Sequence, residues 1–253
     1  MRRTLLTWAL LAAATLAVAA PARFEDSMAQ RTLACTSCHG KEGQAAPDGY
    51  YPRIAGKPAG YLYNQLLNFR DGRRQFPLMT YMVSNLPEPY LREIAQYFAN
   101  QHPPYAPPPP VAATAAMLER GRVLAQQGDA ARRIPACVAC HGQQLTGVAP
   151  AIPGLLGLPR DYINAQFGAW RNKVRRAQAP DCMADVAARL TDADVAAVSG
   201  WLASQPVEDA ARPATAPAAP LPLRCGGVPE HGTAPATAQE SGAASGTAHG
   251  AAR

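Results

Sequence analysis

The sequence predicts an all-α protein in which two small helical domains follow one another along the chain. Its clearest feature is an internal repeat, because the Cys-x-x-Cys-His-Gly motif at 35–40 occurs again at 137–142. A proline-rich segment, 103–110, separates the two copies, and the segments around each motif carry helical rather than strand patterns. We therefore expect two related helical domains, each wrapped around one bound cofactor.

The repeat extends well beyond the cysteine motif. A Pro-x-[Ile/Leu]-x-Gly element begins at Pro52 in the first copy and at Pro153 in the second. A duplication followed by small changes in loop length explains such a pattern. The further matched positions are Tyr61 with Tyr162, Gln65 with Gln166, Phe69 with Trp170, Met79 with Met183 and Leu86 with Leu190.

Helices account for the matched segments. In 61–70 and 162–173, a tyrosine, a glutamine and an aromatic residue recur at every fourth position, which places them on one helical face. Residues 25–34 and 115–127 each form a predicted helix leading into a cysteine motif. Thr191 is typical of the N-cap of a final helix in the second copy, and nothing in the sequence indicates strands.

Composition divides the chain. The proline run has few amide donors and favours an extended, semi-rigid linker. After the second copy the chain is rich in Ala, Pro, Thr and Gly, so we expect a tail held at Cys225 and otherwise disordered. The predicted division is a signal peptide at 1–22, a first domain at 23–102, a linker at 103–113, a second domain at 114–206 and a tail at 207–253.

The N-terminal segment resembles a secretory signal. Arg2 and Arg3 precede an apolar stretch at 5–20, and small residues after it offer an Ala-x-Ala cleavage site. An uncleaved membrane anchor is the alternative, but the apolar run is short for a span of about 20 residues. We expect cleavage and a mature protein in the periplasm, which is an oxidising compartment.

The charge pattern argues against one class of partner. The formal net charge is +6, yet the lysines and arginines form no dense run. Nucleic acid is therefore not an expected partner.

The Cys-x-x-Cys-His motif is the attachment site of c-type haem. Two thiols at this spacing can form thioethers to one porphyrin, and the adjacent histidine can bind the iron. A zinc half-site would need a second ligand pair in each copy, and a redox-active cysteine pair needs no histidine. We expect two covalently attached haem c groups, held by Cys35, Cys38 and His39 and by Cys137, Cys140 and His141.

Methionine is the expected second axial ligand of each iron. The repeat matches Met79 with Met183, each seven residues before a leucine, whereas Met82 has no counterpart. Core filling is the usual role of methionine, but equivalent positions in two diverged copies favour ligation. Met82 is the alternative ligand in the first copy, and we expect it to line the pocket instead.

These paired elements resemble the cytochrome c4 family, the dihaem members of the class I cytochromes c, over residues 24–206. The resemblance implies two class I cytochrome c-like domains with His/Met-ligated haems, and it implies that Pro52 and Pro153 orient the histidines through their carbonyl groups. It also implies electron transfer from the quinol-oxidising side of a respiratory chain towards a terminal oxidase. We expect the two haems to face each other across the domain interface, with Tyr61 and Tyr162 near them. The alternative for each tyrosine is an ordinary aromatic residue of the domain core.

Iron with two strong axial ligands has no open position for a substrate, so we expect an electron carrier and not an enzyme. The expected partners are membrane redox complexes, a quinol-oxidising donor and a terminal oxidase, and peripheral association with the membrane is compatible with the sequence. One alternative is a haem c subunit docked to a membrane dehydrogenase or oxidase. A dihaem redox enzyme is a further one.

Two cysteines lie outside the haem motifs. Cys182 directly precedes Met183, and Cys225 lies in a short apolar stretch of the tail. Two such thiols in an oxidising compartment predict a disulfide, and the alternative is a pair of free thiols.

Overall fold

The computed structural model describes residues 25–46 and 49–229, and it is predominantly helical, as predicted. The signal peptide predicted at 1–22 and the last part of the tail, 230–253, lie outside the described residues. The first half contains α1 (Met28–Arg31), α2 (Leu33–His39), η1 (Lys41–Gly43), α3 (Ala59–Arg70), α4 (Pro77–Val83) and α5 (Glu88–Ala99). The second half contains α6 (Ala115–Gln126), η2 (Ala130–Arg132), α7 (Cys137–His141), α8 (Arg160–Arg171), α9 (Cys182–Arg189) and α10 (Asp192–Ser204).

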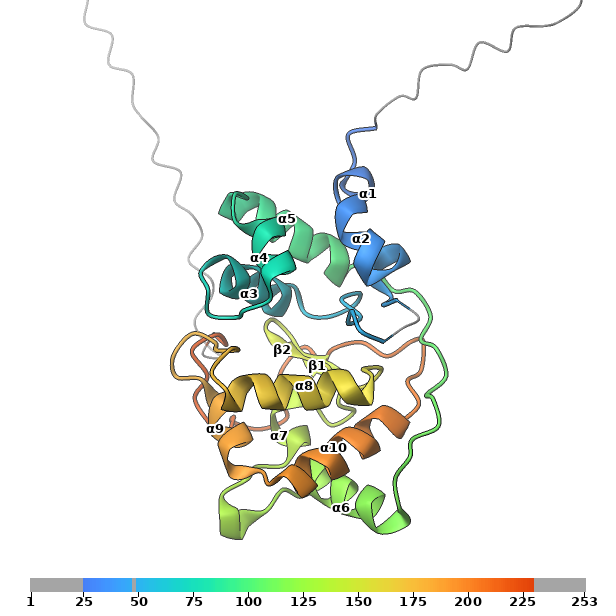
Figure 1. Cartoon of the computed structure of the whole chain (residues 1–253), viewed down its shortest axis with the longest axis vertical. Coiled ribbons are helices and arrows are strands. Elements are labelled where there is room, and N and C mark those ends of the chain that lie inside the picture. The colour runs from blue at the N-terminus through green and yellow to red at the C-terminus, as the bar shows by residue number, and fades with distance from the viewer. Residues whose placement is uncertain (1–24, 47–48, 230–253) are drawn as a thin grey trace, which may run out of the picture.

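The two halves are stacked along the long axis of the molecule (Figure 1). Helix α3 of the first half faces α8 of the second, together with the short strands β1 (Gly147–Val148) and β2 (Ile152–Pro153). Each half has its own apolar core. Leu62, Ile94 and Phe98 lie at the centre of the first core, and Leu124 and Leu202 lie at the centre of the second. The predicted tandem arrangement of helical units is therefore present.

One short antiparallel ladder departs from the all-helical expectation. Strands β1 (Gly147–Val148) and β2 (Ile152–Pro153) pair directly after the second cysteine motif. Each strand is only two residues long, which is too short to show the alternation of apolar and polar residues by which strands are recognised in a sequence. Gly147 has a φ of +102°, and a Cβ there would lie 2.7 Å from the Gly154 nitrogen, so the close approach requires glycine.

Helices α6 and α10 cross closely in the second domain. A Cβ at Gly121 would lie 2.2 Å from the carbonyl oxygen of Ala197, so glycine permits the contact. The predicted N-cap at Thr191 is present, and with Asp194 it forms a capping box at the start of α10.

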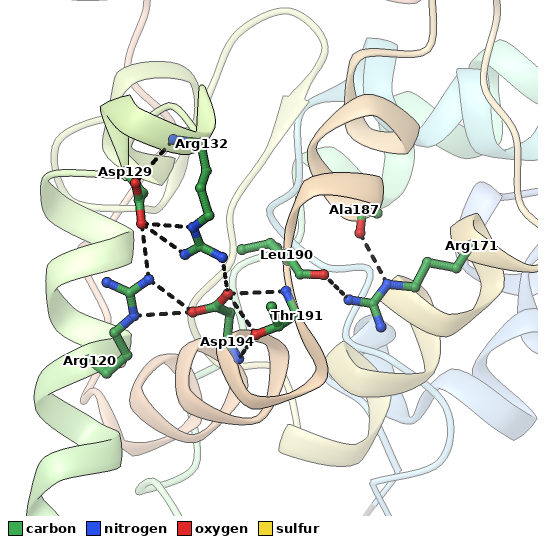
Figure 2. A network of polar contacts seen from close by, with 8 residues as sticks. All are labelled: Arg120, Asp129, Arg132, Arg171, Ala187, Leu190, Thr191 and Asp194. Atoms are coloured by element: carbon green, nitrogen blue, oxygen red, sulfur yellow. Dashed lines mark hydrogen bonds and ion pairs between the residues drawn. The ribbon is translucent and has the colours of Figure 1, made fainter.

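The crossing is reinforced by an ion-pair network around Asp194, shown in Figure 2. This carboxylate is only 4% exposed, and it accepts hydrogen bonds from Arg120 (3.0 Å) and Arg132 (2.6 Å). Asp129 accepts from the same two arginines, at 3.2 and 2.9 Å. Burial alone would raise the pKa of Asp194, but the hydrogen bonds from Arg132 and Thr191 outweigh it and hold the pKa far below its usual range.

Helix α9 is fastened to α8 by one arginine, also drawn in Figure 2. Arg171 donates to the carbonyl oxygen of Ala187 at 3.1 Å and to that of Leu190, two acceptors at the end of α9. These carbonyl groups have no partner within the helix, so the guanidinium serves as its C-terminal cap.

The proline-rich linker is held against the first domain. Arg53 donates to the carbonyl oxygen of Pro104 at 3.1 Å, and its guanidinium lies 3.8 Å from the centre of the Tyr105 ring. The backbone nitrogen of Tyr105 donates to Asp209 of the tail at 3.0 Å. The linker is therefore bonded both to the first domain and to the start of the tail.

The tail itself corrects the sequence-based expectation. Residues 207–229 follow a defined path and are not held at Cys225 alone. Ala214 exchanges backbone hydrogen bonds with Gly147 (2.9 Å) and Ala149 (2.8 Å), and Gly226 donates to Pro180 at 2.9 Å. The prediction of disorder assumed that nothing would offset the entropy cost of ordering this segment. These hydrogen bonds offset it, and they cannot be foreseen from amino-acid composition.

The structure contains the predicted disulfide between Cys182 and Cys225, with a Cα–Cα distance of 5.1 Å. It joins the tail to the first residue of α9, the helix that carries Met183.

Across 25–46 and 49–229, no helix combines the length and the apolar character needed to span a membrane.

The network around Asp194 generates a first prediction. Asp194→Asn should lower the free energy of unfolding by about 2–3 kcal/mol, because it leaves two arginines without their buried acceptor. Since the pKa of this carboxyl is depressed on folding, its contribution is present above about pH 4 and is lost as the pH falls below that value. Urea unfolding at pH 7 and at pH 3 measures both effects.

The matched control is Asp185→Asn, which removes a carboxylate paired with Arg189 on the surface of α9. The Asp185 side chain is 63% exposed, so the change should cost less than about 0.5 kcal/mol. Equal losses from the two variants would contradict the assigned role of the Asp194 network.

The disulfide generates a second prediction. It closes a loop with a sequence separation of 43 residues. The double variant Cys182→Ser/Cys225→Ser should therefore lose about 4 kcal/mol of stability by the chain-entropy estimate. Thermal unfolding with and without a reductant measures this loss, and the reductant should destabilise the wild type while leaving the variant unchanged. Equal stability of the oxidised wild type and the variant would show that the bridge does not constrain the chain.

Candidate haem sites

Both cysteine motifs lie on short helices that end at the histidine. Cys35 and Cys38 are on α2, while Cys137 and Cys140 are on α7, and the helical spacing places each pair of sulfurs on one face. The glycine after each histidine stops the helix, because Gly40 has a φ of +76° and a Cβ there would lie 2.3 Å from the Ala45 oxygen. The chain thus turns away at the point where the histidine enters the interior.

The two histidines are buried and held in the same way. Nδ1 of His39 donates to the carbonyl oxygen of Pro52 at 2.9 Å, and Nδ1 of His141 donates to that of Pro153 at 2.7 Å. Burial lowers the pKa of both imidazoles. Each ring is therefore neutral at pH 7 and keeps its Nε2 lone pair for a metal ion.

One continuous cavity of about 1180 Å³ receives both motifs. It is larger than the roughly 300–1,000 Å³ of an ordinary single-ligand pocket and reaches from one domain into the other. The predicted site residues that line it are Cys35, Cys38, His39, Pro52, Tyr61, Met79, Cys137, Cys140, His141, Pro153, Tyr162 and Met183.

The donor set fits haem c. Each domain offers a pair of thiols beside a neutral imidazole, and thioether sulfur faces the same cavity. Elsewhere in the described part of the chain, His, Cys, Asp and Glu form no cluster of three that could hold a separate metal ion. Most of the remaining lining is apolar, and Leu62, Phe69, Ile163 and Phe167 are among the residues that contribute to it.

The first domain presents two methionines to the cavity. Met79 and Met82 are on α4, one helical turn apart, and both pack near Phe69 and Val83. In the second domain Met183 on α9 lines the cavity. The structure places the sulfurs of both Met79 and Met82 at the site. The choice of Met79 as the candidate ligand therefore rests on the repeat pattern in the sequence.

Two arginines of the site were missed by the sequence reasoning. Arg74 and Arg175 line the cavity where the two domains meet, and they pair as an antiparallel β-bridge. A signal was available, because both occur nine residues after the matched glutamines Gln65 and Gln166. Lys57, whose ammonium donates to the Gly154 carbonyl oxygen at 3.0 Å, is a third cation at the cavity that was missed.

Comparison with known proteins identifies the architecture. No family model matches the chain. The chain is 40% identical over 201 residues to a thiosulfate dehydrogenase electron acceptor from Thiomonas intermedia (strain K12), with 78% of this chain and 91% of the relative covered. It is 31% identical to cytochrome c4 from Pseudomonas aeruginosa, with 68% of this chain and 84% of the relative covered.

The chain belongs to the cytochrome c4 family. The solved structure of reduced cytochrome c4 from Pseudomonas stutzeri agrees with the fold, with a TM-score of 0.60 and 28% identity over 70% of this chain and 95% of that one. As a member of the cytochrome c4 family, the protein carries two covalently bound haem c groups and is a dihaem electron-transfer cytochrome. Haem supplies reversible one-electron chemistry, and the chain supplies attachment, ligation and the electrostatic environment.

Proposed function

We propose that this member of the cytochrome c4 family is the periplasmic electron acceptor of a thiosulfate-oxidising dehydrogenase and passes electrons one at a time towards a terminal oxidase. The observation that carries the proposal is the shared cavity, which brings the haem motifs of both domains to one continuous space. The name of the Thiomonas relative supports the choice of donor.

The ligand assignment is part of the proposal. His39 and Met79 would bind the first iron, and His141 and Met183 the second. The carbonyl groups of Pro52 and Pro153 orient the histidines, and the link from Arg171 to the end of α9 fixes the helix that bears Met183. Two filled axial positions leave no site for a substrate, so the chain acts as a carrier and not as an enzyme.

The internal repeat and the proline-rich segment between its copies support a division of the chain into two domains. We place the first domain at 23–102, the linker at 103–113 and the second domain at 114–206, with a signal peptide at 1–22 that is removed on export. The disulfide between Cys182 and Cys225 supports an oxidising compartment such as the periplasm.

The first domain offers the surface for a redox partner. Of the large exposed apolar side chains in the described part of the chain, most lie on this domain, including Leu78 and Tyr81 of α4 beside the two methionines. Beside the second motif, Cys140 and the tail residues Arg212 and Ala214 line one pocket of about 260 Å³. Part of the surface beside the second motif is thus covered by the tail, and we place the partner surface on α4 of the first domain.

Ligation by methionine generates a third prediction. Met79→Ala and Met183→Ala should each abolish the sulfur-to-iron absorption band of one haem and allow that ferrous haem to bind carbon monoxide. Met82→Ala is the matched control and should retain both bands, because we place its sulfur in the pocket wall. Haem content by mass should stay at two per chain in every variant. Loss of a band in Met82→Ala but not in Met79→Ala would reverse the assignment.

The donor surface generates a fourth prediction. Tyr81 is 78% exposed, so its replacement leaves the core intact. Tyr81→Ser should slow reduction by thiosulfate dehydrogenase about tenfold in stopped-flow measurements, as expected for loss of an aromatic interface contact. Tyr81→Phe should retain the rate, and a small chemical reductant should reduce all forms equally. A wild-type protein that the chemical reductant reduces but thiosulfate dehydrogenase does not would exclude this donor.

A further inference from the structure

The contact between the two domains centres on a symmetric pair of arginines. Arg74 follows α3 and Arg175 follows α8, and the two residues form an antiparallel bridge. The flanking backbone bonds run from Gln75 N to Val174 O and from Arg176 N to Arg73 O, both at 2.7 Å. Equivalent segments of the two repeats thus meet across an approximate twofold axis.

Each guanidinium is held by groups from both domains. Arg74 donates to Gln65 at 2.9 Å within its own domain, and to Tyr162 at 3.0 Å and Gln166 at 2.9 Å in the other. Arg175 mirrors this pattern, with donation to Gln166 at 2.7 Å in its own domain. Across the interface, Arg175 donates to Tyr61 and to Gln65, both at 3.3 Å.

These acceptors are all neutral side chains. Within the described residues, no carboxylate forms an ion pair with Arg74 or Arg175, although many other arginines of the chain have one. Arg175 is only 7% exposed, and burial together with the charge of Arg74 lowers its pKa. An arginine stays protonated in a protein, so the two positive charges remain and require an anion.

The cavity itself does not provide that anion. Among its acidic lining residues, Asp161 is exposed, and Asp181 accepts from the backbone nitrogens of Ala177 (2.7 Å) and Ala184 (3.1 Å). Lys57 adds a further positive charge, and burial lowers its pKa to about 8. The electrostatic balance at the domain interface therefore favours an anionic group that enters from the cavity.

We propose that Arg74 and Arg175 form one shared anion site, whose ligands are the carboxylate side chains of both haems, and that this site couples the two redox centres. The inference rests on the two haems that membership of the cytochrome c4 family establishes. Because each arginine bridges both domains, each of the two positive charges acts on both centres. A positive charge near iron favours the reduced, less positive state, so the pair raises both potentials.

The test is a spectroelectrochemical titration of Arg74→Gln and Arg175→Gln in the full chain with both haems bound. Either change should shift the reduction equilibrium of both haems towards the oxidised state by about tenfold, which corresponds to about 59 mV for one electron. Arg74→Lys retains the charge and should restore most of the difference. Arg122→Gln is the matched control, because Arg122 pairs with Glu119 on the exposed side of α6 and should shift neither potential.

A shift confined to the haem of the mutated domain, or shifts no larger than in Arg122→Gln, would overturn the shared site. The number of haems per chain and the sulfur-to-iron bands are measured on the same samples, so a failure of haem attachment or ligation is distinguished from a failure of this inference.

A measurement on the wild type covers the case in which the glutamine variants do not fold. Redox-difference infrared spectra of protein loaded with haem labelled with ¹³C in its carboxylates should show carboxylate bands at the frequency of ion-paired groups, for both haems. Bands at the frequency of water-solvated carboxylates would overturn the proposal.

Discussion

The structure depends on one constraint, which is that both domains close around a cavity too large to be left empty. Protein interiors pack as densely as organic crystals, so a space of about 1180 Å³ between two small cores requires a large apolar group to complete them. The haems of a cytochrome c4 meet this requirement. The positions of α2, α3 and α4, and of their counterparts in the second domain, follow from the need to surround them.

The chain uses different means to keep the side chains that we propose as iron ligands in place. Each histidine donates a hydrogen bond to the backbone carbonyl group of a proline that lies 12 or 13 residues further along the chain. The helix of Met183 is fixed at both ends, by the disulfide at Cys182 and by Arg171 at the carbonyl groups near Leu190. Within the described residues, no disulfide joins the helix of Met79 to another segment.

The domain interface is polar where the cores are apolar. Tyrosine, glutamine and arginine side chains from both repeats interlock there, and these same side chains line the cavity. Such an interface would be costly if its charges were left uncompensated. The proposed entry of haem carboxylates would compensate these charges, so haem binding and domain association would support each other.

The sequence by itself determined the repeat, the helical class, the covalent attachment of haem, the N-cap at Thr191 and the pairing of Cys182 with Cys225. Each of these depends on local spacing or on the chemistry of a few residue types, and both can be read directly along the chain. Only the tertiary structure decided the path of 207–229, the short β-ladder and the meeting of Arg74 with Arg175. Those features depend on contacts between segments far apart in the chain, where a hydrogen bond or a shared cavity leaves no periodic pattern in the sequence.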